Sequence, residues 1–210
     1  MTSGATPLGL GVLASGRGSN LQAILDACAR PGFPARVVVV ISDRERAQAL
    51  ERARAAGVEA RFINPKDFAD REAFDLALVR EFTARQVGLV CSAGFMRILS
   101  PVFVRAFAGR VVGVHPALLP AFPGLHAQRQ ALAYGVRVAG ATVHFVDEGV
   151  DSGPVILQRA IELPDAADAD AVHDLLRPLE HELLPEAIRL IARGAVSFDP
   201  ANPRRVVISD

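Results

Sequence analysis

The stretch from Arg110 to Gly124 reads RVVGVHPALLPAFPG. Its β-branched start, Val111 to Val114, predicts a short buried strand, and His115 follows directly. Pro116 biases the residue before it toward an extended conformation, so we expect the imidazole of His115 at the carboxyl end of this strand. Ligands of open α/β sheets bind outside that edge, and the stretch therefore predicts where a functional site lies.

A second segment, residues 143–154, reads VHFVDEGVDSGP and leaves another apolar run. It carries Asp147, Glu148 and Asp151 in a loop that contains glycine. A carboxylate beside an imidazole orients it and favours its protonated form. The residues alone leave two interpretations open: a catalytic partner for His115, or a solvated acidic loop near a structural histidine.

Strand and helix patterns alternate along the chain before the stretch 110–124. Apolar strands are predicted at 8–14, 36–41, 58–63 and 87–93, and helices between them. After it, the patterns predict a short helix at 127–134, two long antiparallel strands at 136–146 and 155–163, a helix at 171–193 kinked by Pro178 and Pro185, and a further strand in the tail. The fold class is therefore α/β, with a mostly parallel twisted sheet, helices on both faces and antiparallel strands added in the C-terminal half.

Composition excludes several classes of protein. The chain has 210 residues, half of them hydrophobic, and a formal net charge of zero, which suits a single domain and argues against a non-specific nucleic-acid binder. Its two cysteines do not make a disulfide framework. We find no pattern of a signal peptide or membrane span, so we expect a cytoplasmic protein with no nucleic-acid or membrane partner.

A glycine loop, GRGSN at residues 16–20, joins the first strand to the first helix. It does not match the G-x-G-x-x-G fingerprint of dinucleotide-binding proteins, because Leu21 replaces the last glycine, and it does not match the P-loop motif. Free backbone N–H groups at a helix start, with Ser19 and Asn20 as further donors, nevertheless bind a phosphate or carboxylate. The alternative is an ordinary capped helix.

The long helix near the C-terminus carries a polar stripe. Its members are His173, Arg177, Glu180 and His181, which lie on a face away from the apolar positions. Charged side chains at such positions are mostly solvated, so the residues alone favour an exposed surface for this stripe.

Six stretches together resemble one family, the folate-dependent glycinamide ribonucleotide transformylases (phosphoribosylglycinamide formyltransferases) of purine biosynthesis. They are SGRGSNLQAILDA, DREAFD, AGFMRILSP, HPALLPAFPGLHAQRQAL, HFVDEGVDSGPVILQ and EHELLP, in the family order over nearly the whole chain. The resemblance implies an enzyme that transfers a formyl group from 10-formyltetrahydrofolate to the amine of glycinamide ribonucleotide. It also implies a single Rossmann-like formyltransferase domain, with a nucleotide-phosphate-binding half at 8–107 and a catalytic and folate-binding half at 108–210.

The resemblance also implies roles for individual residues. His115 is the expected catalytic acid and Asp151 its partner. The nucleotide substrate is expected at two groups of residues, Gly18, Ser19 and Asn20 for the phosphate and Arg177, Pro178, Leu179 and Glu180 for the ribose. The folate is expected at Arg71, Met96, Arg97, Ile98, Leu99, Asp147, Glu148, Gly149 and Val150.

These residue types suit the chemistry. The substrate amine attacks the formyl carbon, and an imidazolium stabilises the tetrahedral oxyanion and protonates the leaving folate nitrogen, with no metal or covalent enzyme intermediate. The chain departs from the family pattern at Gly113, where an asparagine would donate to the oxyanion. Loss of one such donor lowers the rate roughly a hundredfold to a thousandfold. We hypothesise that an ordered water, or a donor from elsewhere, replaces it.

Three alternatives stay in view. A formyltetrahydrofolate deformylase would hydrolyse the same folate, but it would carry an N-terminal regulatory domain, whereas the first strand begins almost at once here. A methionyl-tRNA formyltransferase would need an appended C-terminal domain and a basic surface. A catalytically weak folate- or nucleotide-binding protein is favoured only by Gly113. The oligomeric state is open, with a homodimer as one option.

Overall fold

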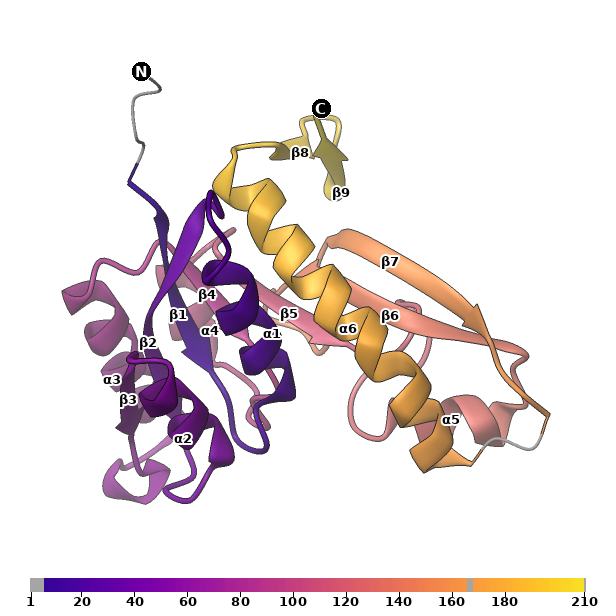
Figure 1. Ribbon diagram of the computed structural model, residues 1–210, viewed down its shortest axis with the longest axis horizontal. Helices are drawn as coiled ribbons and strands as arrows, with labels where there is room; N and C mark the ends of the chain where they lie inside the picture. Colours follow the sequence, from indigo (N-terminus) through magenta and orange to yellow (C-terminus); the bar gives the residue numbers. More distant parts are fainter. Residues whose placement is uncertain (1–5, 166–167, 210) are drawn as a thin grey trace.

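The computed structural model describes residues 6–165 and 168–209. Over these residues one sheet of nine strands forms the frame of the molecule (Figure 1). The strands are β1 (Leu8–Leu13), β2 (Ala35–Ser42), β3 (Glu59–Phe62), β4 (Leu89–Ser92), β5 (Val111–His115), β6 (Val138–Phe145), β7 (Val155–Glu162), β8 (Val196–Asp199) and β9 (Asn202–Ile208). The helices are α1 (Ser19–Cys28), α2 (Gln48–Ala55), α3 (Arg71–Ala84), α4 (Pro101–Ala106), α5 (Ala127–Tyr134) and α6 (Ala169–Ala192), with a 3₁₀ turn at Pro65–Asp67.

The first half of the sheet is parallel, as the alternation of strands and helices predicts. β1 pairs with β2 and β4, β2 pairs with β3, and β4 pairs with β5, all in parallel. The β-branched run Val39 to Ile41 in β2 has no exposed surface. Residues of α1, α2 and α6 join one apolar core cluster and those of α3 and α4 join another, so helices cover both faces of the sheet. The predicted fold class is confirmed.

The second half of the sheet is antiparallel. β5 pairs with β6 and β6 with β7, so that the strand order continues β4-β5-β6-β7. In the β5–β6 pair, Gly113 lies opposite His144 and His115 lies opposite Thr142. Opposite residues of an antiparallel pair project to the same face, and so do residues two apart on one strand. All four positions therefore face one side of the sheet, next to the carboxyl end of β5.

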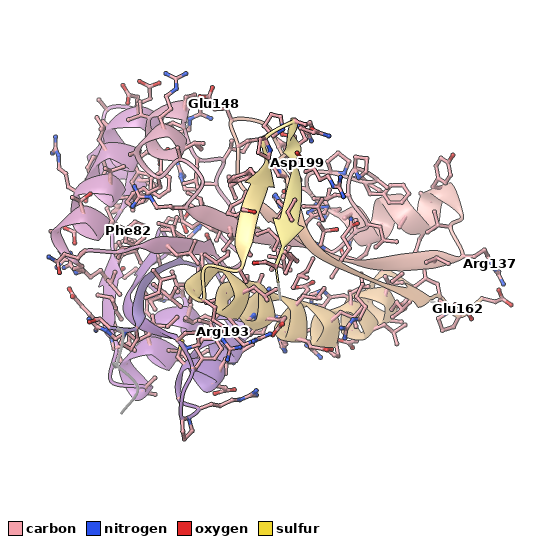
Figure 2. All side chains as sticks on the ribbon, turned by 90° about the horizontal axis from the view of Figure 1, so that it is seen from above. Phe82, Arg137, Glu148, Glu162, Arg193 and Asp199 are labelled. Carbon is pink, nitrogen blue, oxygen red and sulfur yellow. The ribbon has the colours of Figure 1, made fainter. Side chains whose placement is uncertain are left out.

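The long helix α6 crosses the face of the sheet formed by β5, β6 and β7 (Figures 1 and 2). It continues as one helix through Pro178 and Pro185, each of which removes a backbone donor. Leu176, Leu183 and Leu184 are almost completely buried, so packing against the sheet stabilises the helix around both prolines. Because α6 also packs against α1, it brings the C-terminal half of the chain to the glycine loop.

The predicted tail strand is a hairpin of β8 and β9. The two strands are antiparallel, and β9 meets the sheet at Val155, which pairs with Arg205. Figure 2 shows the hairpin above α6, while β6 and β7 extend away from the parallel half to Arg137 and Glu162. Within residues 6–165 and 168–209, no helix combines the length and apolar character needed to span a membrane.

Candidate active site

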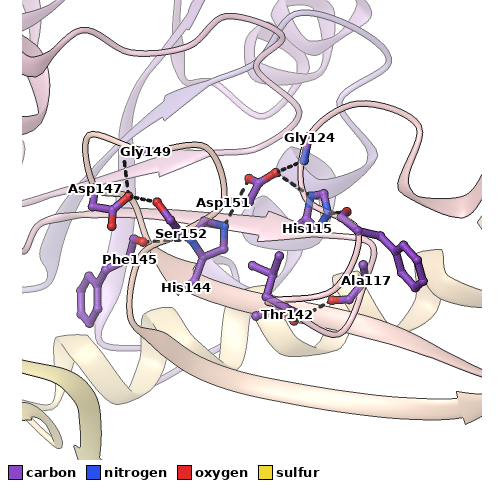
Figure 3. A network of polar contacts seen from close by, with 12 residues as sticks. His115, Ala117, Gly124, Thr142, His144, Phe145, Asp147, Gly149, Asp151 and Ser152 are labelled. Carbon is purple, nitrogen blue, oxygen red and sulfur yellow. Dashed lines mark hydrogen bonds and ion pairs between the residues drawn. The ribbon is translucent and has the colours of Figure 1, made fainter. Parts of the chain in front are cut away.

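His115 and Asp151 form a close pair at the carboxyl end of β5 (Figure 3). Nδ1 of the buried His115 ring lies 3.2 Å from Asp151 Oδ2, and Nε2 lies 2.8 Å from the carbonyl oxygen of Phe122. Both partners are hydrogen-bond acceptors, and only a doubly protonated ring donates to both. A doubly protonated ring, an imidazolium, is the form of histidine that can donate a proton or stabilise a negative charge.

Two loops hold the carboxylate of Asp151 in place. Asp151 has a left-handed backbone with φ 49°, uncommon for a residue with a side chain. Its Oδ2 accepts a 2.8 Å hydrogen bond from the backbone N–H of Gly124, in addition to the contact with His115. Oδ2 thus joins the loop after β6 to the loop after β5, and Oδ1 stays directed toward the ring of His144.

His144 is a site residue that the sequence interpretation did not single out. It is buried opposite Gly113, with Nδ1 2.9 Å from the Phe145 carbonyl oxygen and Nε2 3.7 Å from Asp151 Oδ1. Burial lowers the pKa of His144, although the Phe145 carbonyl and the charge of Asp151 oppose the shift. The strand predicted at 136–146 placed it beside the acidic loop, but only the register of β5 and β6 places it beside Gly113.

Thr142 ties the segment after His115 to the sheet. Its hydroxyl donates a 2.6 Å hydrogen bond to the Ala117 carbonyl and accepts from the Leu119 N–H at 3.1 Å. The Gln158 amide donates to both the Thr142 hydroxyl and the Leu119 carbonyl. This network fixes the direction in which the chain leaves β5, and hence the position of the imidazole.

The glycine loop leads into α1, as predicted. Gly18 has φ 73°, and a Cβ built on it would lie 2.8 Å from Cα of Ala49. Both the left-handed backbone and the close contact with Ala49 therefore favour glycine at this position. The helix begins at Ser19, and its first backbone N–H groups point out of the helix start. The local geometry therefore suits an anion at residues 18–20.

Asn20 and Glu180 lie together, although 160 residues separate them. Asn20 Nδ2 donates a 2.8 Å hydrogen bond to Glu180 Oε2. Burial raises the pKa of Glu180, against the opposing effects of that hydrogen bond and the charge of Arg177. The interpretation of the polar stripe as an exposed surface is wrong for Glu180, which is buried because α6 packs against α1.

The rest of the stripe lies nearer to solvent. Arg177 is partly exposed and pairs with Asp174 at 3.1 Å. His173 lies between two polar groups, with Arg17 Nη2 3.2 Å from its Nε2 and the Gln128 amide 3.5 Å from its Nδ1. Of the remaining predicted ribose residues, Pro178 is exposed and Leu179 is partly buried. Glu180 is thus the one of the four whose carboxylate meets the glycine loop.

The predicted folate residues of the first half meet around a buried acid. Burial raises the pKa of Asp75, and a hydrogen bond from the Ser100 N–H and the charges of Arg71 and Arg97 oppose this shift. Arg71 begins α3, and Arg97 lies 5.2 Å from the ring centre of Phe74 in that helix. The structure therefore brings Arg71 to the segment after β4.

That segment presents apolar side chains to solvent. Met96 is 63% and Ile98 is 55% exposed, while Leu99 is buried. The N–H of Met96 donates a 2.9 Å hydrogen bond to the hydroxyl of Ser15, which connects the segment to the glycine loop. Exposed large apolar side chains suit a flat heterocycle that stacks on them.

The acidic loop after β6 holds its own shape. Asp147 Oδ1 accepts a 3.0 Å hydrogen bond from the Gly149 N–H, and Glu148 is paired with Arg105 at 2.8 Å. Gly149 and Val150 are exposed. Glu148 is therefore held by Arg105, while residues 149–150 stay open to solvent.

A cleft of about 680 Å³ opens at the carboxyl edge of the parallel strands. It is lined by residues 15–17 after β1, 43–48 after β2, 64–66 after β3 and Arg97 after β4. Sequence interpretation missed the segment 43–48, whose charged residues carry no motif. Among residues 6–165 and 168–209, no three His, Cys, Asp or Glu side chains gather in a group that could hold a metal ion.

Comparisons with known proteins agree with this architecture. A family model described as "Formyl transferase" matches residues 10–188. The phosphoribosylglycinamide formyltransferase of Mycobacterium tuberculosis (strain CDC 1551 / Oshkosh) is 46% identical over 193 residues, which cover 92% of this chain and 89% of that protein. Among solved structures, glycinamide ribonucleotide transformylase 1 from Symbiobacterium toebii matches with a TM-score of 0.95 and 48% identity, covering 100% of both chains.

Longer relatives also contain this unit. The trifunctional purine biosynthetic protein adenosine-3 of Drosophila melanogaster is 46% identical over 191 residues. The match covers 90% of this chain but 14% of that protein, so the chain spans a small part of the relative's length. It is therefore similar both to stand-alone proteins and to one segment of a larger one.

Proposed function

The chain belongs to the formyl transferase family, and from that premise we propose that it is a phosphoribosylglycinamide formyltransferase. It transfers the formyl group of 10-formyltetrahydrofolate to the amine of glycinamide ribonucleotide, a step of purine biosynthesis. The observation that carries the proposal is the pair of the buried His115 and the partly buried Asp151 at the carboxyl end of β5, where an α/β sheet binds its ligands.

The nucleotide binds at the junction of α1 and α6. Its phosphate accepts hydrogen bonds from the backbone N–H groups of Gly18 to Asn20, which the positive end of the α1 dipole reinforces. Its ribose hydroxyls donate to the carboxylate of Glu180, bounded by Arg177, Pro178 and Leu179. The hydrogen bond between Asn20 and Glu180 supports this placement, because it sets the distance between the two subsites.

The folate binds between the loop after β4 and the loop after β6. Arg71 and Arg97 supply positive charge for its carboxylates, and Met96, Ile98 and Leu99 supply apolar surface and backbone hydrogen bonds. Asp147, Glu148, Gly149 and Val150 form the opposite wall. The exposure of Met96 and Ile98 supports this assignment, because a bound ring system would cover them.

The reaction proceeds by attack of the substrate amine on the formyl carbon. The imidazolium of His115 stabilises the oxyanion and gives its proton to the folate nitrogen as the bond from that nitrogen to carbon breaks. The amine's proton passes to Asp151, directly or through water. One of the two acceptors of His115 must give way, and we assign this to Phe122, since Asp151 is held by Gly124.

Two further features belong to this proposal. The scheme needs no metal ion and no covalent intermediate with the enzyme, because a positioned proton donor and acceptor suffice for acyl transfer from a tertiary amide-like nitrogen. We also place the enzyme in the cytoplasm, and we assign it no nucleic-acid or membrane partner, since its positive and negative side chains balance.

A coupled assay tests the proposal. Purified protein is incubated with glycinamide ribonucleotide and 10-formyltetrahydrofolate, and the formylated nucleotide and free tetrahydrofolate are both quantified. We expect equal amounts of the two products. Release of formate without formylated nucleotide would assign the chain to folate hydrolysis, and binding of both ligands without turnover would make it a binding protein; either result refutes the proposal.

A further inference from the structure

Gly113 leaves room for a small group beside the catalytic pair. It lies in β5 opposite His144, and its side-chain position faces the same side of the sheet as His115. Its φ is not positive, and a Cβ built on it would have Val146 Cγ2 at 3.5 Å and His144 Nε2 at 3.6 Å as its nearest neighbours. These are ordinary van der Waals distances, so the position accepts a group larger than hydrogen.

His144 presents a hydrogen-bond acceptor to this space. Its Nδ1 lies 2.9 Å from the carbonyl oxygen of Phe145, which can only accept, so Nδ1 carries the ring proton. Burial lowers the pKa of His144 and favours the neutral ring, which has a lone pair on Nε2, while the Phe145 carbonyl and the charge of Asp151 oppose the shift. Asp151 Oδ1, 3.7 Å away, is a second acceptor. Two acceptors at that separation do not bond to each other, and Nε2 is free to accept from a third group.

We propose that His144 is a positioning residue that holds a water molecule beside Gly113, and that this water stabilises the oxyanion formed during formyl transfer. The water donates one hydrogen bond to His144 Nε2 and directs its other proton to the formyl oxygen as negative charge develops there. The inference rests on the proposed function and extends it to a group that the sequence does not encode.

In this arrangement the catalytic groups and the water do not compete for the same hydrogen bonds. Asp151 Oδ2 is occupied by His115 and by the Gly124 N–H, so Oδ1 receives the proton of the substrate amine. The water donates to His144 and to the oxyanion, and His115 protonates the leaving nitrogen. A water is less rigid than an amide fixed to the backbone. We therefore expect it to contribute about tenfold to a hundredfold in kcat, less than a fixed oxyanion donor.

A double-mutant cycle tests the inference. Gly113→Ala fills the space with a methyl group, and His144→Phe keeps a ring but removes the acceptor. We expect each variant to lower kcat by about tenfold to a hundredfold, with KM for glycinamide ribonucleotide within about twofold of wild type. The double variant should fall no further than the worse single variant, because both changes remove the same water. Effects that multiply in full would overturn the inference.

Gly113→Asn supplies the matched rescue. Its amide can donate to the oxyanion directly, so we expect kcat at or above the wild-type value, and less than about a threefold further loss when His144→Phe is added. Melting temperatures of all variants check folding; if His144→Phe does not fold, the comparison of Gly113→Ala with Gly113→Asn remains decisive. A folded Gly113→Ala protein as active as wild type would overturn the water, and the proposed function would stand. A wild-type protein without formyl transfer would instead refute the proposed function.

Discussion

The side-chain amide of Asn20, at the start of α1, donates a 2.8 Å hydrogen bond to the carboxylate of Glu180 in the middle of α6. Glu180 is buried there, and Asn20 Oδ1 is also buried without a hydrogen-bond partner in the part of the chain that the structure describes. A buried polar atom without a partner is costly in a folded protein and calls for an explanation. Binding of a substrate that donates to it would supply one.

We expect the buried carboxylate of Glu180 to lower the stability of the folded protein, while it contributes to substrate binding. Its pKa is raised by burial, so the folded chain holds this proton more tightly than the unfolded chain. Stability is therefore lost as pH rises through the raised pKa, and Glu180→Gln, which removes this loss, should raise the melting temperature at pH 8 by about a few degrees. The gain should vanish at a pH below the ordinary glutamate value of 4.5, as thermal melts at both pH values would reveal.

The same variant should bind the nucleotide less well. A neutral amide accepts weaker hydrogen bonds from ribose hydroxyls than a carboxylate does, so KM for glycinamide ribonucleotide should rise about tenfold. KM for the folate should stay the same. A Glu180→Gln protein with unchanged nucleotide affinity would remove Glu180 from the ribose site.

Asp151→Asn should lower kcat by about a hundredfold or more and leave folate binding nearly unchanged. The asparagine can still accept from the Gly124 N–H, so the loop keeps its shape, but the amide neither takes up a proton nor favours the imidazolium of His115. Steady-state kinetics with both substrates would measure the change in kcat separately from the change in KM for the folate. Asp165→Asn, at an exposed pair with Arg137, is the control, and equal turnover of Asp151→Asn and this control would contradict the role.

Gly18→Ala should destabilise the fold more than the same substitution at Gly194. Gly18 and Gly194 share φ 73°, but a Cβ would lie 2.8 Å from Ala49 at Gly18 and would meet no atom within 4 Å at Gly194. Gly194→Ala should therefore lose about 1 kcal/mol, from backbone strain alone, and Gly18→Ala about 1–3 kcal/mol more. Urea unfolding of both variants would measure the difference, and equal losses would show that the loop adjusts to Ala49.

Arg71→Ala and Arg97→Ala should each raise KM for 10-formyltetrahydrofolate by about tenfold or more, since each removes a charge-assisted contact to a carboxylate. KM for the nucleotide should not change. Arg54→Ala, on the exposed side of α2, is the control for general loss of positive charge. If all three variants behave alike, the folate carboxylates bind elsewhere.

The local features of this protein could be predicted from its sequence. Alternating strands and helices, the β-branched run 36–41, the glycine loop before α1 and the histidine after β5 all follow from short-range periodicity and from the chemistry of glycine and proline. The resemblance to a family, carried by six stretches along the chain, supplied the pairing of His115 with Asp151 in advance. The spacing of the residues alone did not decide between a catalytic pair and a solvated acidic loop near a structural histidine.

Only the tertiary structure decided which distant residues meet. The polar stripe of α6 looked exposed because periodicity does not say what packs against a helix face, and the contact with α1 buries Glu180. Likewise Gly113 and His144 belong to separate strands, and the register of β5 and β6 alone sets them opposite each other. Register depends on hydrogen bonds and side-chain packing between strands that the intervening chain does not specify locally. For that reason the sequence did not predict that His144 Nε2 lies beside Gly113, and the tertiary structure was needed to show it.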